Sequence, residues 1–265
     1  MNVHELYQAG QLNDAVASLI EVVKKKPTDR ESRGLLCELM IVQGALERAD
    51  KQLDLIAHQT PEQAMGVSLY RQLIRAEEAR EQFFSQGRVP EVLVEPDTQM
   101  QKYLQASICL REGNFQEAQQ ILEEVEDKRQ PLSGVCNGQS FSDFRDLDDR
   151  TPAVFEILTS TGKYYWVPFE LVSHIEFHAP ERPLDLLWRR VTLETKIEHA
   201  EGDVYIPCTY YQGDDVSVTE AQRLGRETDW LGNETEPMRG VGQRLFLVGD
   251  DAVSIMELNE LSFNE

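Results

Sequence analysis

The sequence predicts an α+β protein of two domains, with helical repeats in the first half and an antiparallel sheet in the second. Three observations support this prediction. A pattern of glycine, leucine and alanine recurs at a fixed offset of 34 residues, from Gly10 to Gly44. Of the 21 aromatic residues, 15 lie in residues 131–265. In that second half, the alternation of apolar and polar residues that is typical of strands replaces the apolar stripe of a helix.

The repeat is clearest over residues 10–27. Glycine ends one helix, alanine allows close packing, leucine and valine form an apolar stripe, and proline ends the next helix. A period of about 34 residues is typical of helix–turn–helix solenoids. The pattern resembles a tetratricopeptide repeat (TPR) without its first-helix aromatic, and an ordinary array of α-hairpins is the alternative. The matched positions are Gly10, Leu12, Ala15, Leu19, Val22 and Pro27; Gly44, Leu46, Ala49, Leu53, Ile56 and Pro61; and Gly113, Phe115, Ala118, Leu122 and Val125, with Pro131 one residue late.

The TPR-like helical domain is expected over residues 1–130. Pro27 separates two hairpins, Gly87 ends a long helix, and Asp97 is the expected N-cap of a later helix. The long helix stands where a third repeat should begin, so we interpret it as an irregular repeat. The expected segments are four helices within residues 2–58, a helix over 62–86, a proline-bounded loop over 88–97, and helices over 98–111 and 115–126.

A linker rich in glycine, serine and asparagine is expected over residues 131–142, followed by the α+β domain over 143–265. Apolar alternation on both sides of short turns predicts two β-hairpins, and two further apolar runs predict additional strands. These segments predict an antiparallel sheet. The hairpins are expected at 154–168 and 189–208, and the further strands at 245–248 and 255–258.

Charge and cysteine content restrict the classes of partner. The net charge of −21 excludes nucleic acid, because a phosphate backbone would be repelled. Cys37, Cys109, Cys136 and Cys208 are scattered without a C-x-x-C pair, which indicates buried, reduced thiols. Neither a signal peptide nor an apolar run of membrane-spanning length is found. We therefore expect a cytoplasmic protein without a membrane partner.

Residues 174–178 form the first candidate chemical site. His174, Glu176 and His178 would share one face of a strand, where they would hold a metal ion for a metal-dependent hydrolase. A third ligand at a recognised spacing is missing, and the alternative is a strand with a polar exposed face.

The acidic run at residues 143–150 is the second candidate. Calcium would require a glycine at the sharp turn of the loop, and this run has none. We interpret it as a solvated loop at the start of the sheet, in which acids pair with neighbouring arginines. Its charged members are Asp143, Arg145, Asp146, Asp148, Asp149 and Arg150.

Trp188 and Arg189 are the third candidate, because tryptophan and arginine are enriched at the centres of protein interfaces. The alternative is that Trp188 anchors the core while the arginine neutralises nearby acids. The sequence leaves both interpretations open.

Six unusual blocks in fixed order make the second half similar to the ImpE family, also called TagJ or SciE-type, whose members accompany type VI secretion gene clusters. The resemblance covers nearly all of residues 140–263, and TPR-like repeats suit the family as well. The blocks are FRDLDDR (144–150), GKYYWVPF (162–169), RPLDLLWR (182–189), GDVYIP (202–207), LGRETDW (224–230) and GVGQRLFLVG (240–249).

The resemblance implies a non-enzymatic accessory protein without a cofactor or small-molecule substrate. Family members are understood to bind a helix of the small subunit of the contractile sheath, and so to affect sheath recycling by the associated ATPase. No catalytic residue is implied. The alternatives are the metal-dependent hydrolase described above and a generic TPR adaptor that binds a disordered peptide.

The repeat register predicts where a partner helix would bind. In TPR-like stacking the first helix of each pair lines the concave side, which here means the helices near 30–43 and 98–111. Two alternatives stay open. In the first, the apolar residues among the predicted contacts belong to the core between repeats. In the second, segment 62–86 fills the concave side, and binding moves to Trp188 and Arg189. The predicted contact residues are Glu31, Glu38, Ile41, Tyr103, Ser107 and Arg111.

Overall fold

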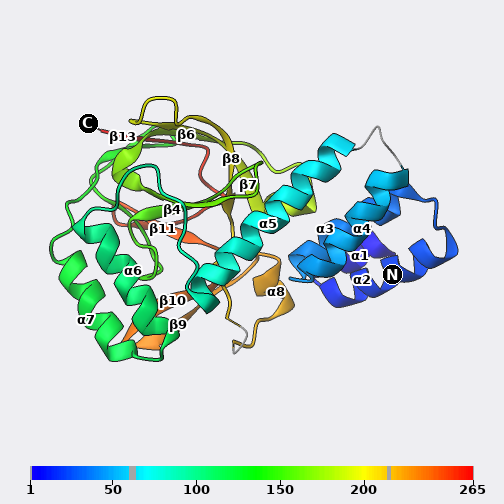
Figure 1. The fold of residues 1–265 in the computed structure, drawn as a ribbon, viewed down its shortest axis with the longest axis horizontal. Helices are drawn as coiled ribbons and strands as arrows, with labels where there is room; N and C mark the ends of the chain where they lie inside the picture. Colours follow the sequence, from blue (N-terminus) through cyan, green and yellow to red (C-terminus); the bar gives the residue numbers. More distant parts are fainter. Residues whose placement is uncertain (1, 60–63, 214–215, 265) are drawn as a thin grey trace.

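The computed structural model describes residues 2–59, 64–213 and 216–264. The N-terminus lies among α1–α4 at one end of the molecule, and the C-terminus lies beside the large sheet at the other (Figure 1). The long helix α5 runs diagonally between these two parts (Figure 1). The helices of the first half are α1 Val3–Gln8, α2 Leu12–Lys25, α3 Arg30–Val42, α4 Leu46–Gln59, α5 Ala64–Gln86, α6 Thr98–Arg111 and α7 Phe115–Glu126.

Helices α1–α4 form the two predicted hairpins and confirm the TPR-like architecture. Gly10 and Gly44 have φ of +79° and +81°, the left-handed conformation in which glycine commonly ends a helix. Ala15 and Ala49 are completely buried, which allows the paired helices to approach closely. Pro61, the second closing proline of the repeat, lies outside the described residues.

Helix α5 confirms the long helix predicted over 62–86, of which residues 62 and 63 lie outside the described residues. It ends at Gly87, whose φ is +80°. Phe83 of α5 packs edge-on against Trp166 of the sheet, with ring centroids 4.7 Å apart. Helix α5 therefore contributes to the core that both halves of the chain share.

The helices predicted over 98–111 and 115–126 are α6 and α7. The Asp97 side chain caps α6 by accepting the backbone N–H of Met100 at 2.8 Å, as predicted. None of the helices in the described parts of the chain has the length and apolar character that a bilayer crossing requires.

The second half forms an eight-stranded antiparallel sheet in the order β2-β1-β13-β6-β7-β8-β4-β5. Two smaller sheets, β12-β11-β3 and β10-β9, complete this half. The predicted hairpins are confirmed as β4–β5 and β7–β8. The strands are β1 Gly134–Cys136, β2 Gln139–Phe141, β3 Phe144–Asp146, β4 Val154–Leu158, β5 Tyr164–Pro168, β6 Val172–Phe177, β7 Trp188–Thr195, β8 Gly202–Pro207, β9 Thr228–Asn233, β10 Glu236–Gly242, β11 Leu245–Val248, β12 Asp251–Ser254 and β13 Glu260–Phe263.

Strand β4 is buried on both faces. Val154 and Leu158 belong to a core built together with the helices, whereas Phe155 and Ile157 belong to a second core on the opposite face. The alternation in this strand therefore separates two cores, rather than a core from solvent. Its central residue, Glu156, points to the helical side and is 1% exposed.

The prediction of an unstructured linker over 131–142 is wrong over most of that range, because strands β1 and β2 lie within it. Asn137 and Gly138 have positive φ and form the tight turn of a hairpin. Strand β1 then pairs with β13 at the far end of the sequence. Glycine and asparagine here shape a turn within the sheet, and a domain boundary near residue 130 stays a prediction.

The strand expected over 255–258 is also wrong. Strand β12 ends at Ser254, and the chain turns before β13 begins at Glu260. Ile255 and Leu258 are nevertheless completely buried. These apolar side chains fill the second core from a turn, which an apolar pattern alone does not distinguish from a short strand.

The short helix α8, Glu220–Arg223, and the turn after it hold the helical hairpins against the second half. Arg226 donates to the carbonyl oxygens of Tyr7 and Gln8 at 2.9 and 3.0 Å, at the end of α1. Arg223 donates to the carbonyl of Gln43 at the end of α3, at 3.3 Å. Helix C-termini carry unpaired carbonyls and partial negative charge, so each arginine caps one hairpin.

We predict that Arg226→Ala loosens the first hairpin. Loss of these partly exposed, charge-assisted hydrogen bonds should lower the free energy of unfolding by about 1 kcal/mol. Hydrogen exchange should become faster for the amides of α1 and the start of α2. Arg48→Ala, at an exposed position on α4, is the matched control. Equal exchange rates in the two variants would contradict the capping role.

Candidate functional site between the helices and the sheet

A buried carboxylate, Glu156 of β4, binds two arginines where α5 crosses the sheet. Arg80 of α5 donates to it from Nε at 2.8 Å and from Nη2 at 3.1 Å. Arg244, just before β11, donates to its Oε2 from the other side. The Tyr164 hydroxyl donates to Oε1 at 2.6 Å. All four side chains are at least 97% buried, so this network connects the two halves without help from bulk water.

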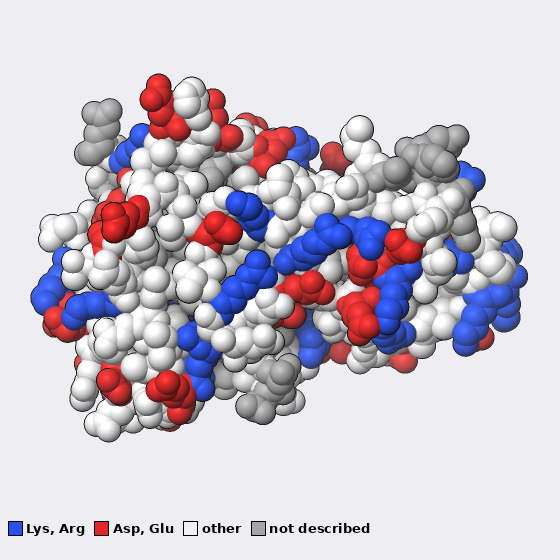
Figure 2. Space-filling view, viewed as in Figure 1, with Lys and Arg blue, Asp and Glu red and all other residues white. Residues whose placement is uncertain are grey.

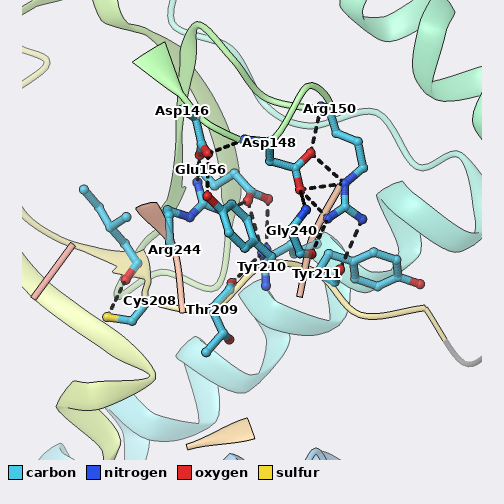
Figure 3. Close-up of polar contacts among 12 residues, drawn as sticks. Asp146, Asp148, Arg150, Glu156, Cys208, Thr209, Tyr210, Tyr211, Gly240 and Arg244 are labelled. Atoms are coloured by element: carbon cyan, nitrogen blue, oxygen red, sulfur yellow. Dashed lines mark hydrogen bonds and ion pairs between the residues drawn. The ribbon is translucent and has the colours of Figure 1, made fainter. Parts of the chain in front are cut away.

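The network continues through Asp146 and Asp148. Arg244 donates to Asp146 at 2.9 Å, and the Tyr210 hydroxyl donates to the same carboxylate at 3.0 Å. Asp148 faces the guanidinium of Arg150 and accepts its Nε–H at 2.9 Å (Figure 3). Arg150 also donates to the carbonyl of Tyr211 at 3.1 Å. Its guanidinium is therefore fixed at the outer edge of the network.

The interpretation of residues 143–150 as a solvated loop is wrong for its central acids. Asp146 and Asp148 are 0% and 1% exposed. The expected pairing of acids with neighbouring arginines is confirmed by Asp148 with Arg150 and by Asp149 with Arg145, the latter at 2.8 Å. The local sequence indicated these acid–arginine pairs. It did not indicate that α5 and β11 pack over the loop and bury its central acids.

Burial and charge shift the pKa values in opposite directions within the network. Burial raises the pKa of Asp146 to about 7, although the guanidinium of Arg244 opposes this effect. Burial also acts to raise the pKa of Glu156, but Arg80 and Arg244 outweigh it and hold that pKa far below its usual range. Glu156 is thus permanently charged, whereas Asp146 titrates near neutral pH.

A cavity of about 380 Å³ lies beside the network, between the end of α5, helices α6 and α7, and strand β10. Its walls carry three arginines and three aromatic rings, and none of the described residues that line it is acidic. We call it the arginine pocket. Its defining residues are Phe84, Arg111, Phe115, Arg150, Tyr211 and Arg239.

A second cavity, of about 210 Å³, is mainly apolar and lies between the loop at 88–97, α6 and the sheet. Val94, Met100, Tyr103 and Phe169 are among its walls. The loop also forms a parallel bridge to the sheet edge, where Glu91 pairs with Tyr165 of β5. The predicted loop thus adds one isolated bridge to the edge of the sheet.

The predicted contact residues are dispersed by the structure. Ser107 and Arg111 line the arginine pocket, whereas Tyr103 is 2% exposed and lines the apolar cavity. Glu31 is exposed on α3, but Ile41 is 1% exposed and belongs to the core between the helices. The core alternative is therefore correct for Ile41 and Tyr103.

Glu38 lies against the second half of the chain rather than in an open groove. It is half-buried, and α3 contacts the 3-10 helix η3, Pro183–Leu186. Burial raises the pKa of Glu38, although Arg182 and the backbone N–H of Leu184 oppose this effect. The concave side expected along α3 is thus occupied at this residue.

Trp188 and Arg189 do not form an exposed interaction surface. They are 1% and 2% exposed. Trp188 donates its Nε1–H to Glu77 of α5 at 2.9 Å, and Arg189 donates to the carbonyls of His178 and Ile255. The core-anchor alternative is correct for Trp188, because its indole reaches across to a helix of the first half.

His174 and His178 contact different neighbouring strands. His174 Nδ1 lies 2.9 Å from the hydroxyl of Ser262 in β13, and His178 Nε2 lies 2.9 Å from that of Thr192 in β7. No three His, Cys, Asp or Glu side chains of the described chain are gathered as metal ligands. The four cysteines are free and buried, as predicted.

Sequence reasoning missed Arg80, Glu156 and Arg244 as a group. Two signals were present: Arg80 follows Ala79 on the apolar stripe of α5, and Glu156 stands in the middle of an apolar strand. Charged residues at core positions are almost always paired. Their partners are 76 and 88 positions away in the sequence, so local patterns do not identify them.

We predict that Glu156→Gln strongly destabilises the protein. Removing one member of a buried ion network leaves uncompensated charge, which typically costs about 3–5 kcal/mol. Urea unfolding followed by tryptophan fluorescence measures this loss. Glu176→Gln, an exposed residue on a strand of the same sheet, is the matched control and should change stability little. Similar losses in both variants would contradict the role of Glu156.

We also predict a pH-dependent contribution from Asp146. Its folded pKa of about 7 lies above the unfolded value of about 3.9, so the folded state binds the proton more tightly. Protonation of Asp146 therefore raises the free energy of unfolding. This gain is fully present below pH 4 and is lost as pH rises through 7. Relative to Asp146→Asn, the wild type should gain about 1 kcal/mol between pH 8 and pH 6. A pH-independent difference in urea unfolding would contradict this assignment.

Comparisons with known proteins identify the family. A family model described as ImpE protein matches residues 138–262, and one described as tetratricopeptide repeat matches residues 6–73. The type VI secretion system accessory component TagJ of Pseudomonas aeruginosa is 30% identical over 270 residues, covering 99% of this chain and 91% of that protein. The crystal structure of protein VPA1032 from Vibrio parahaemolyticus, 29% identical, matches with a TM-score of 0.92 and covers 99% of this chain and 97% of that one. The chain belongs to the ImpE family, as its sequence blocks predicted.

Proposed function

We propose that this protein is an accessory component of a type VI secretion system and that it acts by binding another protein. The observation that carries the proposal is the similarity to TagJ over 99% of the chain, including both the helical repeats and the sheet. TPR-like hairpins support it, because helical repeats commonly bind polypeptide segments. We propose that it acts in the cytoplasm without a cofactor or chemistry of its own.

We further propose that the partner is a helix of the small subunit of the contractile sheath, and that binding indirectly affects the sheath-recycling ATPase. The net charge of −21 supports a partner helix with basic positions. An amphipathic helix in a groove is a common mode of peptide recognition.

Of the predicted contact residues, Glu31 is the acidic one that is exposed on the helical repeats. It lies in the first turn of α3, away from the buried Ile41. We therefore propose that the partner helix contacts the outer end of α3 rather than its covered concave side.

The function is tested by calorimetry of the full chain with a peptide of the sheath subunit's N-terminal helix. A scrambled peptide of the same composition is the control for non-specific charge attraction. Saturable binding of the native peptide alone is expected. Equal binding of both peptides, or no binding, would contradict the proposed partner.

The proposed contact is tested by Glu31→Lys, which should weaken binding about fivefold at low salt because one favourable exposed pair becomes repulsive. Glu176→Lys makes the same charge change at an exposed position on β6 and should leave affinity unchanged. Equal effects of the two substitutions would show that only net charge matters.

A further inference from the structure

The apolar cavity is a site that the proposed function does not use. All the residues that line it belong to described parts of the chain, chiefly the loop ahead of α6, the first turns of α6 and the sheet. Phe144 of β3, Val154 of β4 and Phe169, in the 3-10 helix after β5, are among its walls and are buried. The cavity is therefore built on the cores of the second half rather than on surface side chains alone.

The polar groups around this cavity are already paired. The Tyr103 hydroxyl accepts a hydrogen bond from the Gln99 amide at 3.0 Å. Arg129 binds Glu126 at 3.0 Å and Asp143 at 2.6 Å, so its charge is balanced. A buried water needs about two to four polar partners, and apolar cavities without them stay dry. The lining therefore suits an apolar group better than water or a polar ligand.

The volume of the cavity fits a single side chain. Apolar protein cavities of about 150 Å³ hold benzene. This cavity measures about 210 Å³, which leaves room for an aromatic ring with its methylene carbon but not for a stretch of backbone. Filling it would remove most of the apolar surface of one phenylalanine or leucine side chain from water, which is the main favourable contribution to such binding.

The cavity opens to the surface between apolar and acidic side chains. Val94 is 41% exposed, and Glu95 and Glu170 are also exposed. Neither glutamate has a hydrogen bond or ion pair among the described residues. On the face in Figure 2, basic side chains gather along the course of α5, whereas the surface over the loop ahead of α6 is mainly uncharged or acidic. Unpaired glutamates at the mouth repel an acidic segment and attract a basic one.

We propose that the apolar cavity binds one phenylalanine or leucine side chain of a partner polypeptide in which lysine or arginine flanks that side chain. The apolar side chain lies beside Met100 and Phe169, and the flanking cations lie against Glu95 and Glu170. Helix α3, which carries Glu31, and helix α6 lie toward opposite ends of the molecule (Figure 1). The cavity is therefore a second contact surface, separate from the one proposed on α3.

The probe is a short blocked peptide with one phenylalanine flanked by lysines, titrated into the full chain at low salt. NMR of isotopically labelled methionine methyl groups reports the site directly, because Met100 lines the cavity and is 4% exposed. Met40, in the core of the hairpins, and Met238 of β10 lie elsewhere and are internal references. A saturable shift of the Met100 signal, without shifts of these two, is expected.

Matched probes separate the apolar contact from charge attraction. The peptide with alanine in place of phenylalanine should bind at least about tenfold more weakly, because it leaves the cavity empty. The peptide with glutamate in place of lysine should also bind more weakly. Toluene should compete with the phenylalanine peptide, since both need the same cavity.

Variants at the mouth test the flanking contacts. Glu95→Lys and Glu170→Lys should each weaken binding of the phenylalanine peptide about threefold at low salt, and less at high salt. Glu176→Lys makes the same charge change at an exposed position on β6 and should bind normally. All three positions are exposed, so thermal unfolding should be unchanged, which separates lost binding from lost folding.

Four outcomes would overturn the proposal. They are no shift of Met100 with the phenylalanine peptide, equal binding of the alanine peptide, equal effects of Glu170→Lys and Glu176→Lys, and a Met100 shift with toluene but not with the peptide. The last outcome would assign the cavity to small apolar molecules only. Because the probe is unrelated to the sheath helix, failure here leaves the proposed function standing, and the reverse also holds.

Discussion

The carboxylate of Glu156 is the point at which the two halves of this protein are joined. It lies in a strand that is covered on both faces, so its charge is balanced by protein groups rather than by water. Arg80 reaches it from a helix of the first half and Arg244 from the second. Buried ion pairs often contribute little net stability compared with apolar packing. We interpret this one as a device that fixes how α5 crosses the sheet.

The junction also explains why the helical repeats differ from an open peptide-binding solenoid. The 3-10 helix η3 contacts α3 on the side where α3 would otherwise present a groove, and α5 packs against α4. Arg223 and Arg226 cap the ends of α3 and α1. The hairpins are therefore held at their ends and along one face. Partners are left with outer surfaces and with the pockets between α6, α7 and the sheet.

Several of the blocks that define the family have structural explanations. The block at 144–150 contains the acids of the buried network, and that at 240–249 contains Arg244. The block at 182–189 forms the contact with α3 and provides the indole that reaches α5. The block at 224–230 contains Arg226, which caps α1. Much of the family pattern therefore maintains the junction between repeats and sheet.

The sequence by itself determined the elements whose signals are local. Glycines in left-handed turns, the Asp97 cap and the apolar period set the helix ends and two hairpins, because these depend on neighbouring residues. Tertiary structure decided whatever depends on distant partners. It paired the supposed linker with the C-terminal strand, buried Asp146 and Trp188, and brought Arg111 and Arg239 to the walls of one cavity. Burial and pairing depend on which elements contact each other. Local sequence patterns do not show which residues more than a hundred positions apart will be in contact.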